Sequence, residues 1–351
     1  MATSQPAKRL KTTGSNGPLI GTHNGHFHAD EALAVYMLRL LPPYNPSSLL
    51  RTRDPALLST CHTVVDVGGE YDPQANRYDH HQRTFTTTFP ARPTKLSSAG
   101  LVYLHFGKAI LAQRTGLSEG DGEVEVLWRK VYEDFVEALD AHDNGISMYD
   151  PSDTKNIQKR FHDSGINLGS LVGDLNANFD GEGGKSKEEM QETEDTRFLS
   201  AAEMIGECFL RKVAYYHKAW LPARKLVRET YEKRKEYDAQ GRLMVLPRGC
   251  PWKDHLYTLE AEEGTEGGVW YVLYPEGEHE GSKWRVQAVS INTDSFESRN
   301  PLPEAWRGVR DEELTEKAGV EGCVFVHASG FIGGNKSREG ALEMARKAVA
   351  M

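Results

Sequence analysis

The sequence predicts an α/β protein with two domains. The first is an N-terminal parallel β-sheet covered by helices on both faces, and the second is a smaller C-terminal α/β domain. Short β-branched runs alternate with helical patterns over the first half of the 351 residues, and strand-like apolar runs dominate after about residue 240. This length is sufficient for two separate cores. We expect a polar tail over 1–18, the first domain over 19–190, a helical connector over 191–240 and the second domain over 241–351.

In the first domain, apolar runs bounded by polar or turn residues predict short strands, and apolar residues at helical spacing predict helices. The first helix begins with acidic residues and is stopped by Pro42 and Pro43. The expected strands are 19–23, 49–52 and 63–67, and the expected helices are 30–41, 97–112 and 124–141.

The polar, glycine-rich stretch 174–194 predicts a loop, and a long helical region follows over 195–237, broken near Pro222. Many lysines and arginines lie in this region, which favours either a solvated helix face or a surface that faces nucleic acid. After it we expect strands at 243–246, 256–259, 270–274, 284–291 and 323–327, then a final helix at 337–350.

Composition excludes several classes of function. No apolar run approaches the ~20 residues that span a bilayer, so we expect no membrane partner. The net charge of -9 excludes a generic polyanion binder unless a local basic face or bound metals offset the repulsion. The four cysteines lack CxxC spacing, which argues against disulfides and against a thiolate zinc site.

The first 18 residues predict where the protein acts in the cell. They contain no acidic residue and include a short basic cluster from Pro6 to Lys11, which is typical of nuclear import. The same tail suits a mitochondrial presequence less well, because it has one arginine and little amphipathic pattern. We expect a nuclear protein, with the mitochondrion as a second location. A plain solvated tail and a cytoplasmic location are the fallback.

Histidines and aspartates recur at the ends of the predicted strands. Imidazoles and carboxylates bind divalent metals without thiol chemistry, and strand ends place ligand-binding groups at one edge of an open α/β sheet. This many ligands exceeds what one metal needs, so the sequence predicts two divalent cations, with Mn²⁺ favoured and Mg²⁺ or Zn²⁺ as alternatives. His26 more simply fills its loop. The candidate ligands are His23, His28, Asp30, Asp66, Asp79, His80, His81, Asp140 and Asp143.

These segments resemble the melanocyte proliferating gene protein branch of the DHH phosphoesterase superfamily. The resemblance covers nearly everything from residue 19 to the end. It is carried by Thr22–Ala34 (THNGHFHADEALA), Val64–Pro73 (VVDVGGEYDP), Tyr78–Gln82 (YDHHQ), Thr94–Gly100 (TKLSSAG), Asp143–Gly145 (DNG), Trp220–Arg224 (WLPAR), Pro251–Lys253 (PWK), His327–Gly334 (HASGFIGG) and Arg338–Ala341 (REGA).

The resemblance implies a DHH catalytic domain followed by a substrate-binding domain, and a 3′-to-5′ RNA exonuclease activity in the nucleus and mitochondria. It implies that His81 contacts phosphate and that the metal ligands are His23, His28, Asp30, Asp66 and His80. The chain departs from the superfamily at His28, where most members have an aspartate and one residue fewer after the first histidine. The last ligand is either Asp140 or Asp143, and spacing alone does not decide between them.

A second cluster predicts a site for the phosphate end of a substrate. Gly333 and Gly334 follow a strand and precede a helix, where a backbone loop and a helix N-terminus bind anions. His327, Lys336 and Arg338 add polar and charged groups, and arginine binds phosphate with two parallel hydrogen bonds. Arg53 and Lys95 lie near the metal segments and are either phosphate contacts or plain surface cations.

Together these features predict a metal-dependent phosphodiesterase that acts by two-metal hydrolysis, and the resemblance implies that it releases nucleoside monophosphates from single-stranded RNA. Asp79, His80 and His81 are the expected catalytic residues, with Asp79 supporting its neighbours and Asp66 bridging the two ions. Two alternatives stay open: a phosphoesterase for small substrates such as a cyclic dinucleotide or pyrophosphate, and a non-catalytic nucleic-acid binder. Protein partners are not indicated.

Overall fold

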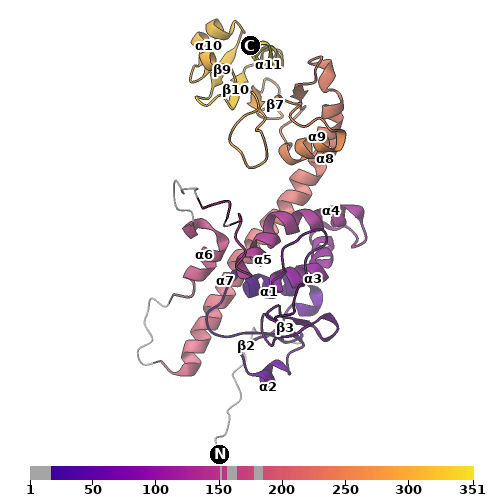
Figure 1. Ribbon diagram of the computed structural model, residues 1–351, viewed down its shortest axis with the longest axis vertical. Coiled ribbons are helices and arrows are strands. Elements are labelled where there is room, and N and C mark those ends of the chain that lie inside the picture. The colour runs from indigo at the N-terminus through magenta and orange to yellow at the C-terminus, as the bar shows by residue number, and fades with distance from the viewer. Residues whose placement is uncertain (1–16, 151, 156–163, 178–184) are drawn as a thin grey trace, which may run out of the picture. The chain divides into compact units, whose positions relative to one another are not determined.

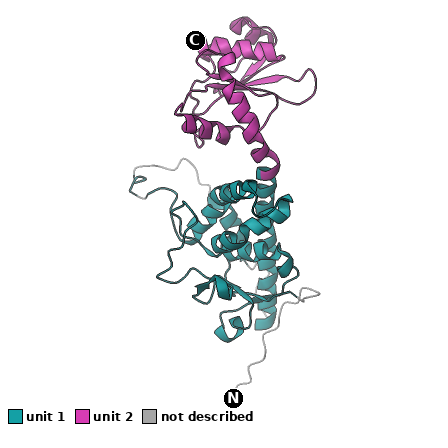
Figure 2. Cartoon of the chain, turned by 90° about the vertical axis from the view of Figure 1, so that its right-hand side faces the viewer, with its two compact units in different colours: residues 1–216 teal, residues 217–351 magenta. Residues whose placement is uncertain are grey.

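The computed structural model describes residues 17–150, 152–155, 164–177 and 185–351, which form two compact units, Met1–Tyr216 and His217–Met351 (Figure 2). The basic cluster from Pro6 to Lys11 lies outside the described residues. No helix among the described residues is long and apolar enough to cross a membrane.

Unit 1 contains the predicted parallel sheet (Figure 1). Its strands run in the order β2-β1-β3-β5-β4, and every pairing is parallel except that of β4 with β5. The strands are β1 (Ile20–Thr22), β2 (Leu49–Arg51), β3 (Thr63–Val65), β4 (Tyr71–Asp72) and β5 (Arg77–Tyr78). The three strands predicted from sequence are therefore confirmed, and two short ones are added.

Helices cover both faces of this sheet, as predicted. Side chains alternate between the faces of a strand, so Leu50 and Val64 point toward α2 (Pro55–Leu58), where they pack with Leu58 and Cys61. Gly21 faces the same helix, and a Cβ there would lie 2.8 Å from Cys61 Sγ. On the sheet's other side, α1 (Ala29–Arg39) contacts β3 and α3 (Ser98–Thr115) contacts β5.

The remaining helices of unit 1 pack around α1 and α3. A π-helical segment, Tyr132–Val136, lies between α4 (Gly122–Val131) and α5 (Glu137–Asp143). Helix α6 spans Leu168–Asp174, and the long helix α7 (Lys187–Tyr215) packs against α1. The predicted loop over 174–194 is wrong from Lys187 onward, because Ser186 and Glu189 form a capping box that begins α7.

Unit 2 has a mixed sheet in the order β6-β7-β8-β10-β9, in which β6 and β7 are parallel and the other neighbours are antiparallel. The strands are β6 (Leu243–Val245), β7 (Tyr271–Pro275), β8 (Trp284–Ala288), β9 (Cys323–Val326) and β10 (Ile332–Asn335). The helices are α8 (Leu221–Glu232), α9 (Lys253–Glu263), α10 (Asp311–Ala318) and α11 (Arg338–Ala350). Pro222 lies in the first turn of α8, after a π-helical turn at Tyr216–Trp220.

Two predictions for unit 2 are wrong. Residues 256–259 belong to helix α9, where Leu256 and Leu259 are buried on one helical face. Gly333 and Gly334 are not in a loop, because they lie in β10 between β8 and β9. The backbones of the neighbouring strands lie close to these glycines, since a Cβ at Gly333 would lie 3.1 Å from the Phe325 carbonyl oxygen and a Cβ at Gly334 would lie 3.3 Å from the Trp284 carbonyl oxygen.

Candidate metal centre

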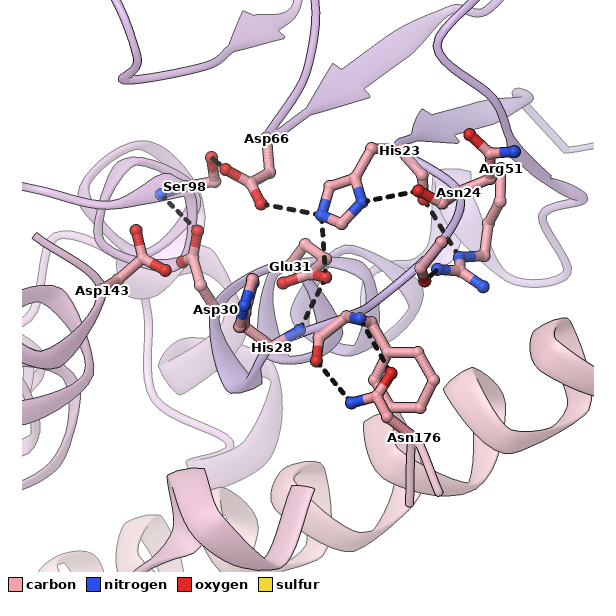
Figure 3. Close-up of polar contacts among 12 residues, drawn as sticks. His23, Asn24, His28, Asp30, Glu31, Arg51, Asp66, Ser98, Asp143 and Asn176 are labelled. Atoms are coloured by element: carbon pink, nitrogen blue, oxygen red, sulfur yellow. Dashed lines mark hydrogen bonds and ion pairs between the residues drawn. The ribbon is translucent and has the colours of Figure 1, made fainter. Parts of the chain in front are cut away.

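Most of the predicted ligands from unit 1 converge near the carboxyl ends of the parallel strands, and Figure 3 shows His23, His28, Asp30, Asp66 and Asp143 there. His23 follows β1, Asp66 follows β3, and Asp79 to His81 follow β5. Because parallel strands end at the same edge of a sheet, residues distant in sequence become neighbours there. Helix α1 begins beside the same edge and carries Asp30 and Glu31 in its first turn.

Asp66 lies between two histidines. Its Oδ2 atom is 3.4 Å from His23 Nε2, and its Oδ1 atom is 3.4 Å from His80 Nε2. His23 Nε2 is also 3.0 Å from Glu31 Oε1, and His80 Nε2 is 2.9 Å from Asp143 Oδ2. Asp66 is 4% exposed and is therefore shared between two imidazoles inside the protein.

The backbone at Asp66 is left-handed, with φ of 57°. This conformation costs a non-glycine residue about 1–2 kcal/mol, and it ends the strand within one residue. Such strain is found at functional sites, where the surrounding structure holds it in place. The strained residue here is the one whose carboxylate lies between the two histidines.

Three groups of side chains among the described residues have the spacing to hold a metal ion. They are His23–His28–Glu31, Asp66–His80–His81 and Asp30–His80–Asp143, and the ligand atoms within each group lie within 4.8 Å of one another. All donors are imidazole nitrogens and carboxylate oxygens, which suit divalent transition metals and Mg²⁺. The donor set therefore fits the divalent metals predicted from sequence.

Opposite charges dominate the electrostatics of this cluster. Burial lowers the pKa of His23, but hydrogen bonds with Asp66 and Glu31 outweigh burial and raise that pKa to about 10. The pKa of His80 is likewise lowered by burial but raised overall to about 10 by Asp143 and Asp66. Burial raises the pKa of Asp66, but its hydrogen bonds with the two histidines lower it well below the usual range.

Asp79 holds His81 rather than joining the three groups. Its Oδ1 atom lies 2.7 Å from His81 Nδ1, and its Oδ2 atom accepts a hydrogen bond from the Gly69 backbone. Asp79 is buried, whereas the His81 side chain is 61% exposed. The imidazole of His81 is thus fixed at one nitrogen and accessible to solvent.

The two alternatives for the last ligand have different surroundings. Asp140 is fully buried and accepts hydrogen bonds from the Ser97 backbone at 3.0 Å and from the Tyr132 hydroxyl at 2.8 Å. Burial raises the pKa of Asp140 to about 7. Asp143 instead contacts His80 and belongs to one of the three groups. Asp140 therefore holds the backbone at Ser97, just before α3, whereas Asp143 faces the metal cluster.

Asp30 links the cluster to the start of α3. Its carboxylate accepts hydrogen bonds from the Ser97 hydroxyl at 2.6 Å and from the Ser98 backbone at 3.1 Å. A carboxylate at a helix N-terminus is favoured by the unpaired N–H groups there. Burial raises the pKa of Asp30 well above its ordinary value, and the nearby charge of Asp66 raises it further.

Side chains from distant parts of unit 1 hold the loop between His23 and His28 (Figure 3). Asn176 pairs with both backbone groups of Phe27: its Oδ1 accepts from the nitrogen at 3.0 Å, and its Nδ2 donates to the oxygen at 2.8 Å. The fully buried Arg51 side chain donates to the Gly25 oxygen at 2.8 Å, and Glu194 accepts from the Gly25 nitrogen at 2.7 Å. The positions of His23 and His28 thus depend on β2, on α7 and on the segment that follows α6.

A pocket of about 300 Å³ opens at the cluster. Arg53 lines it, whereas the Lys95 Nζ atom lies 5.4 Å from the centroid of the Phe85 ring. His26 is exposed and belongs to none of the three groups. The sequence interpretation missed Glu31 and the exposed pocket residue His142. The pocket is lined by His23, His28, Arg53, Asp66, His81, His142 and Asp143.

The predicted phosphate-binding residues belong to unit 2. Lys336 follows β10 and is exposed, and Arg338 is the first residue of α11. The Arg338 guanidinium lies 5.7 Å from the Tyr237 ring centroid and 5.8 Å from that of Trp284. His327 is exposed, and its Nδ1 lies 2.9 Å from the Ser329 hydroxyl.

The comparison with known proteins covers almost the whole chain. The family described as "Uncharacterised protein family (UPF0160)" matches residues 19–349. The mouse MYG1 exonuclease is 48% identical over 98% of this chain and 88% of its own length. The human MYG1 exonuclease is 47% identical over 98% of the chain and 89% of its own length. The yeast MYG1 protein of Saccharomyces cerevisiae is 43% identical over 98% of this chain and 99% of its own length.

Two solved structures are also similar, though weakly. A pGpG-specific phosphodiesterase, PggH from Vibrio cholerae, has 12% identity and a TM-score of 0.26, covering 95% of this chain and 97% of that one. The exonuclease RecJ bound to manganese has 14% identity and the same TM-score. That match covers 95% of this chain and 90% of the RecJ chain. Both TM-scores are low, so the fold description rests on the chain's own elements. The sequence match over nearly the full length shows that the chain belongs to the MYG1 family.

Proposed function

We propose that this protein is a metal-dependent phosphodiesterase, a 3′-to-5′ exonuclease that releases nucleoside monophosphates from single-stranded RNA. The observation that carries the proposal is the convergence of three His/Asp/Glu groups beside one pocket. Full-length similarity to mammalian proteins named exonucleases supports the same reaction class.

Two divalent cations, with Mn²⁺ favoured and Mg²⁺ as the alternative, would supply Lewis-acid polarisation of the phosphate and activation of water. The residues that would hold these cations are His23, His28, Asp30, Asp66, His80 and Asp143. Asp66 would serve both cations, because its two oxygens face different histidines. Asp140 would act by holding Ser97, which also bonds Asp30. The carboxylates and imidazoles orient one another before substrate arrives.

His81 and Arg53 would bind the phosphate itself. Asp79 bonds His81 Nδ1, which leaves the exposed Nε2 side of the ring to donate to a phosphoryl oxygen. The Asp79 contact is the largest cause of the raised pKa of His81, so the donating imidazolium form is favoured. Arg53 is exposed at the same pocket and would attract the anionic backbone of the substrate.

Unit 2 would hold the rest of the RNA. Arg338 and Lys336 supply positive charge at the start of α11, and the exposed imidazole of His327 is a further hydrogen-bonding group. With Gly333 and Gly334 in a paired strand, the phosphate contacts in this unit would come from side chains and the first turn of α11 rather than from a glycine loop.

We also propose that the protein acts in the nucleus, with the mitochondrion as a second location. The basic N-terminal tail supports this proposal.

The test uses one RNA labelled separately at each end. With Mn²⁺, we expect a 3′ label to appear at once as mononucleotide and a 5′ label to appear as a ladder of shortening products. The reverse pattern would contradict the polarity, and internal cuts would contradict exonuclease action. Hydrolysis of a linear or cyclic dinucleotide or of pyrophosphate, with intact RNA, would favour the small-substrate alternative. RNA binding without any hydrolysis would favour a non-catalytic binder.

A further inference from the structure

Glu31 occupies an unusual position for a helix-capping residue. It is the third residue of α1 and forms a capping box with His28, so its carboxylate turns back toward the helix start. It is also fully buried, with 0% exposure, whereas most capping-box glutamates lie at the surface of a helix end, as Glu189 does in α7. Capping alone therefore does not explain why this carboxylate lies inside the protein.

The two carboxylate oxygens of Glu31 have different surroundings. Oε1 accepts a hydrogen bond from the His28 backbone nitrogen at 2.8 Å and lies 3.0 Å from His23 Nε2. Oε2 is buried and has no hydrogen-bond partner among the described residues. Figure 3 shows the carboxylate on the side of α1 that faces His23, with His28 beside it.

An ionised carboxylate with one unsatisfied oxygen is costly inside a protein. A buried polar atom left without a partner destabilises the folded state, and the destabilisation is larger where the group is charged. A cation bound to Oε2 removes this cost. Imidazole nitrogens of His23 and His28 lie within 4.8 Å of each other and of a Glu31 carboxylate oxygen, so two further ligands are available beside this carboxylate.

His23 directs toward Glu31 the ring nitrogen that can bind a metal. His23 Nδ1 lies 3.2 Å from the Asn24 carbonyl oxygen, which can only accept a hydrogen bond. The proton of a neutral His23 therefore belongs on Nδ1, and Nε2 keeps its lone pair for a metal. That Nε2 atom is the one that faces Glu31.

We propose that Glu31 is a metal ligand, which binds through Oε2 a divalent cation that His23 and His28 also hold, while Oε1 keeps its bond to the start of α1. This inference rests on the proposed metal-dependent function and adds to it a ligand outside the set predicted from the sequence. Two imidazoles and one carboxylate favour Mn²⁺ or Zn²⁺ over Mg²⁺. The Asp30–His80–Asp143 group has one imidazole and two carboxylates, so it accepts Mg²⁺ more readily.

The test is Mn²⁺ binding to the metal-stripped full-length chain, measured by isothermal titration calorimetry without RNA. Glu31→Gln keeps an oxygen that can accept from His28 and removes the charge and the second oxygen. We expect this variant to lose one Mn²⁺ per chain, or to bind it at least about 10-fold more weakly. Glu189→Gln makes the same change in the exposed capping box of α7 and should bind Mn²⁺ as wild type does.

Equal Mn²⁺ stoichiometry and affinity in Glu31→Gln and wild type would overturn the role of Glu31 alone. No Mn²⁺ binding by wild type would overturn both this role and the metal-dependent function. If Glu31→Gln does not fold, anomalous diffraction from Mn²⁺-soaked wild-type crystals decides. A peak in contact with Glu31 Oε2 supports the proposal, and peaks that contact the histidines but not Glu31 overturn it.

Discussion

His80 Nε2 lies 2.9 Å from Asp143 Oδ2, so the segment after β5 meets the end of α5 inside the metal cluster. Asp140, one helical turn earlier, instead bonds the Ser97 backbone and the Tyr132 hydroxyl. The two aspartates thus contact different groups, although they lie only three positions apart on one helix.

This difference predicts opposite effects for two substitutions. Asp143→Asn should weaken Mn²⁺ binding by about 10-fold or more and leave thermal stability almost unchanged, since Asp143 faces a pocket. Asp140→Ala should lower the free energy of unfolding by about 1–3 kcal/mol, because it leaves the buried Ser97 nitrogen unpaired. Calorimetry and denaturant unfolding measure the two quantities. If Asp143→Asn binds Mn²⁺ as tightly as wild type does, Asp143 is not a metal ligand.

Metal binding should strengthen as pH rises. In the metal-free protein the pKa values of His23 and His80 are both about 10, so a metal must displace their protons at neutral pH. We expect release of about two protons when both positions fill at pH 7.5. Titration calorimetry in buffers with different ionisation enthalpies measures this number. Heats that do not depend on the buffer would show that the two histidines are already neutral.

The same shifts make the metal-free protein sensitive to alkaline pH. Histidine pKa values raised by folding contribute stability that is fully present below the unfolded value of about 6.5 and is lost as pH rises through about 10. Metal-free protein should therefore melt at a lower temperature at pH 10 than at pH 6.5. Double substitution of His23 and His80 by Gln should reduce this dependence, and an unchanged dependence would assign it to other groups.

Asn176 should control metal affinity without touching the metal. Asn176→Ala removes both hydrogen bonds to the Phe27 backbone, so the loop between His23 and His28 loses part of its support. We expect Mn²⁺ affinity to fall by about 10-fold. Asn167→Ala is the matched control, because Asn167 caps the N-terminus of α6, whose C-terminal end precedes Asn176, and the structure shows no hydrogen bond from Asn167 to the described loop residues. Equal affinities in the two variants would show that the loop is held well enough by Arg51 and Glu194.

Arg338 should act on substrate binding and not on the metals. Arg338→Ala should raise KM for RNA by about 10-fold, with kcat and Mn²⁺ affinity close to wild type, because it removes one phosphate contact. Arg346→Ala is the control, since Arg346 lies near the other end of α11 and also contacts Tyr237. A KM equal to that of wild type would exclude Arg338 from the substrate site.

Local sequence patterns predicted the sheet and most of the cluster. β-branched runs and the histidines and aspartates that follow them are adjacent in sequence, so one pattern indicates both the strand and its ligands. Residues 256–259 were misassigned because a short apolar run fits a strand and a buried helix equally well.

The choice between Asp140 and Asp143 depended on features that spacing does not contain. A π-helical segment at Tyr132–Val136 changes the angular position of every later residue on α5. Glu31 was missed because a glutamate in the first turn of a helix is already explained as a cap. Its contact with His23 depends on a loop that Asn176 and Arg51 hold from distant parts of the chain.

The most direct test of the account is Mn²⁺-dependent hydrolysis by wild type and by Asp66→Asn, whose carboxylate lies between His23 and His80. Metal-stripped wild-type protein should release mononucleotides from single-stranded RNA only after Mn²⁺ is added. Asp66→Asn should fold and hydrolyse RNA at least about 100-fold more slowly. Equal rates in the two proteins, or full activity of wild type in excess chelator, would contradict a catalytic metal centre at this cluster.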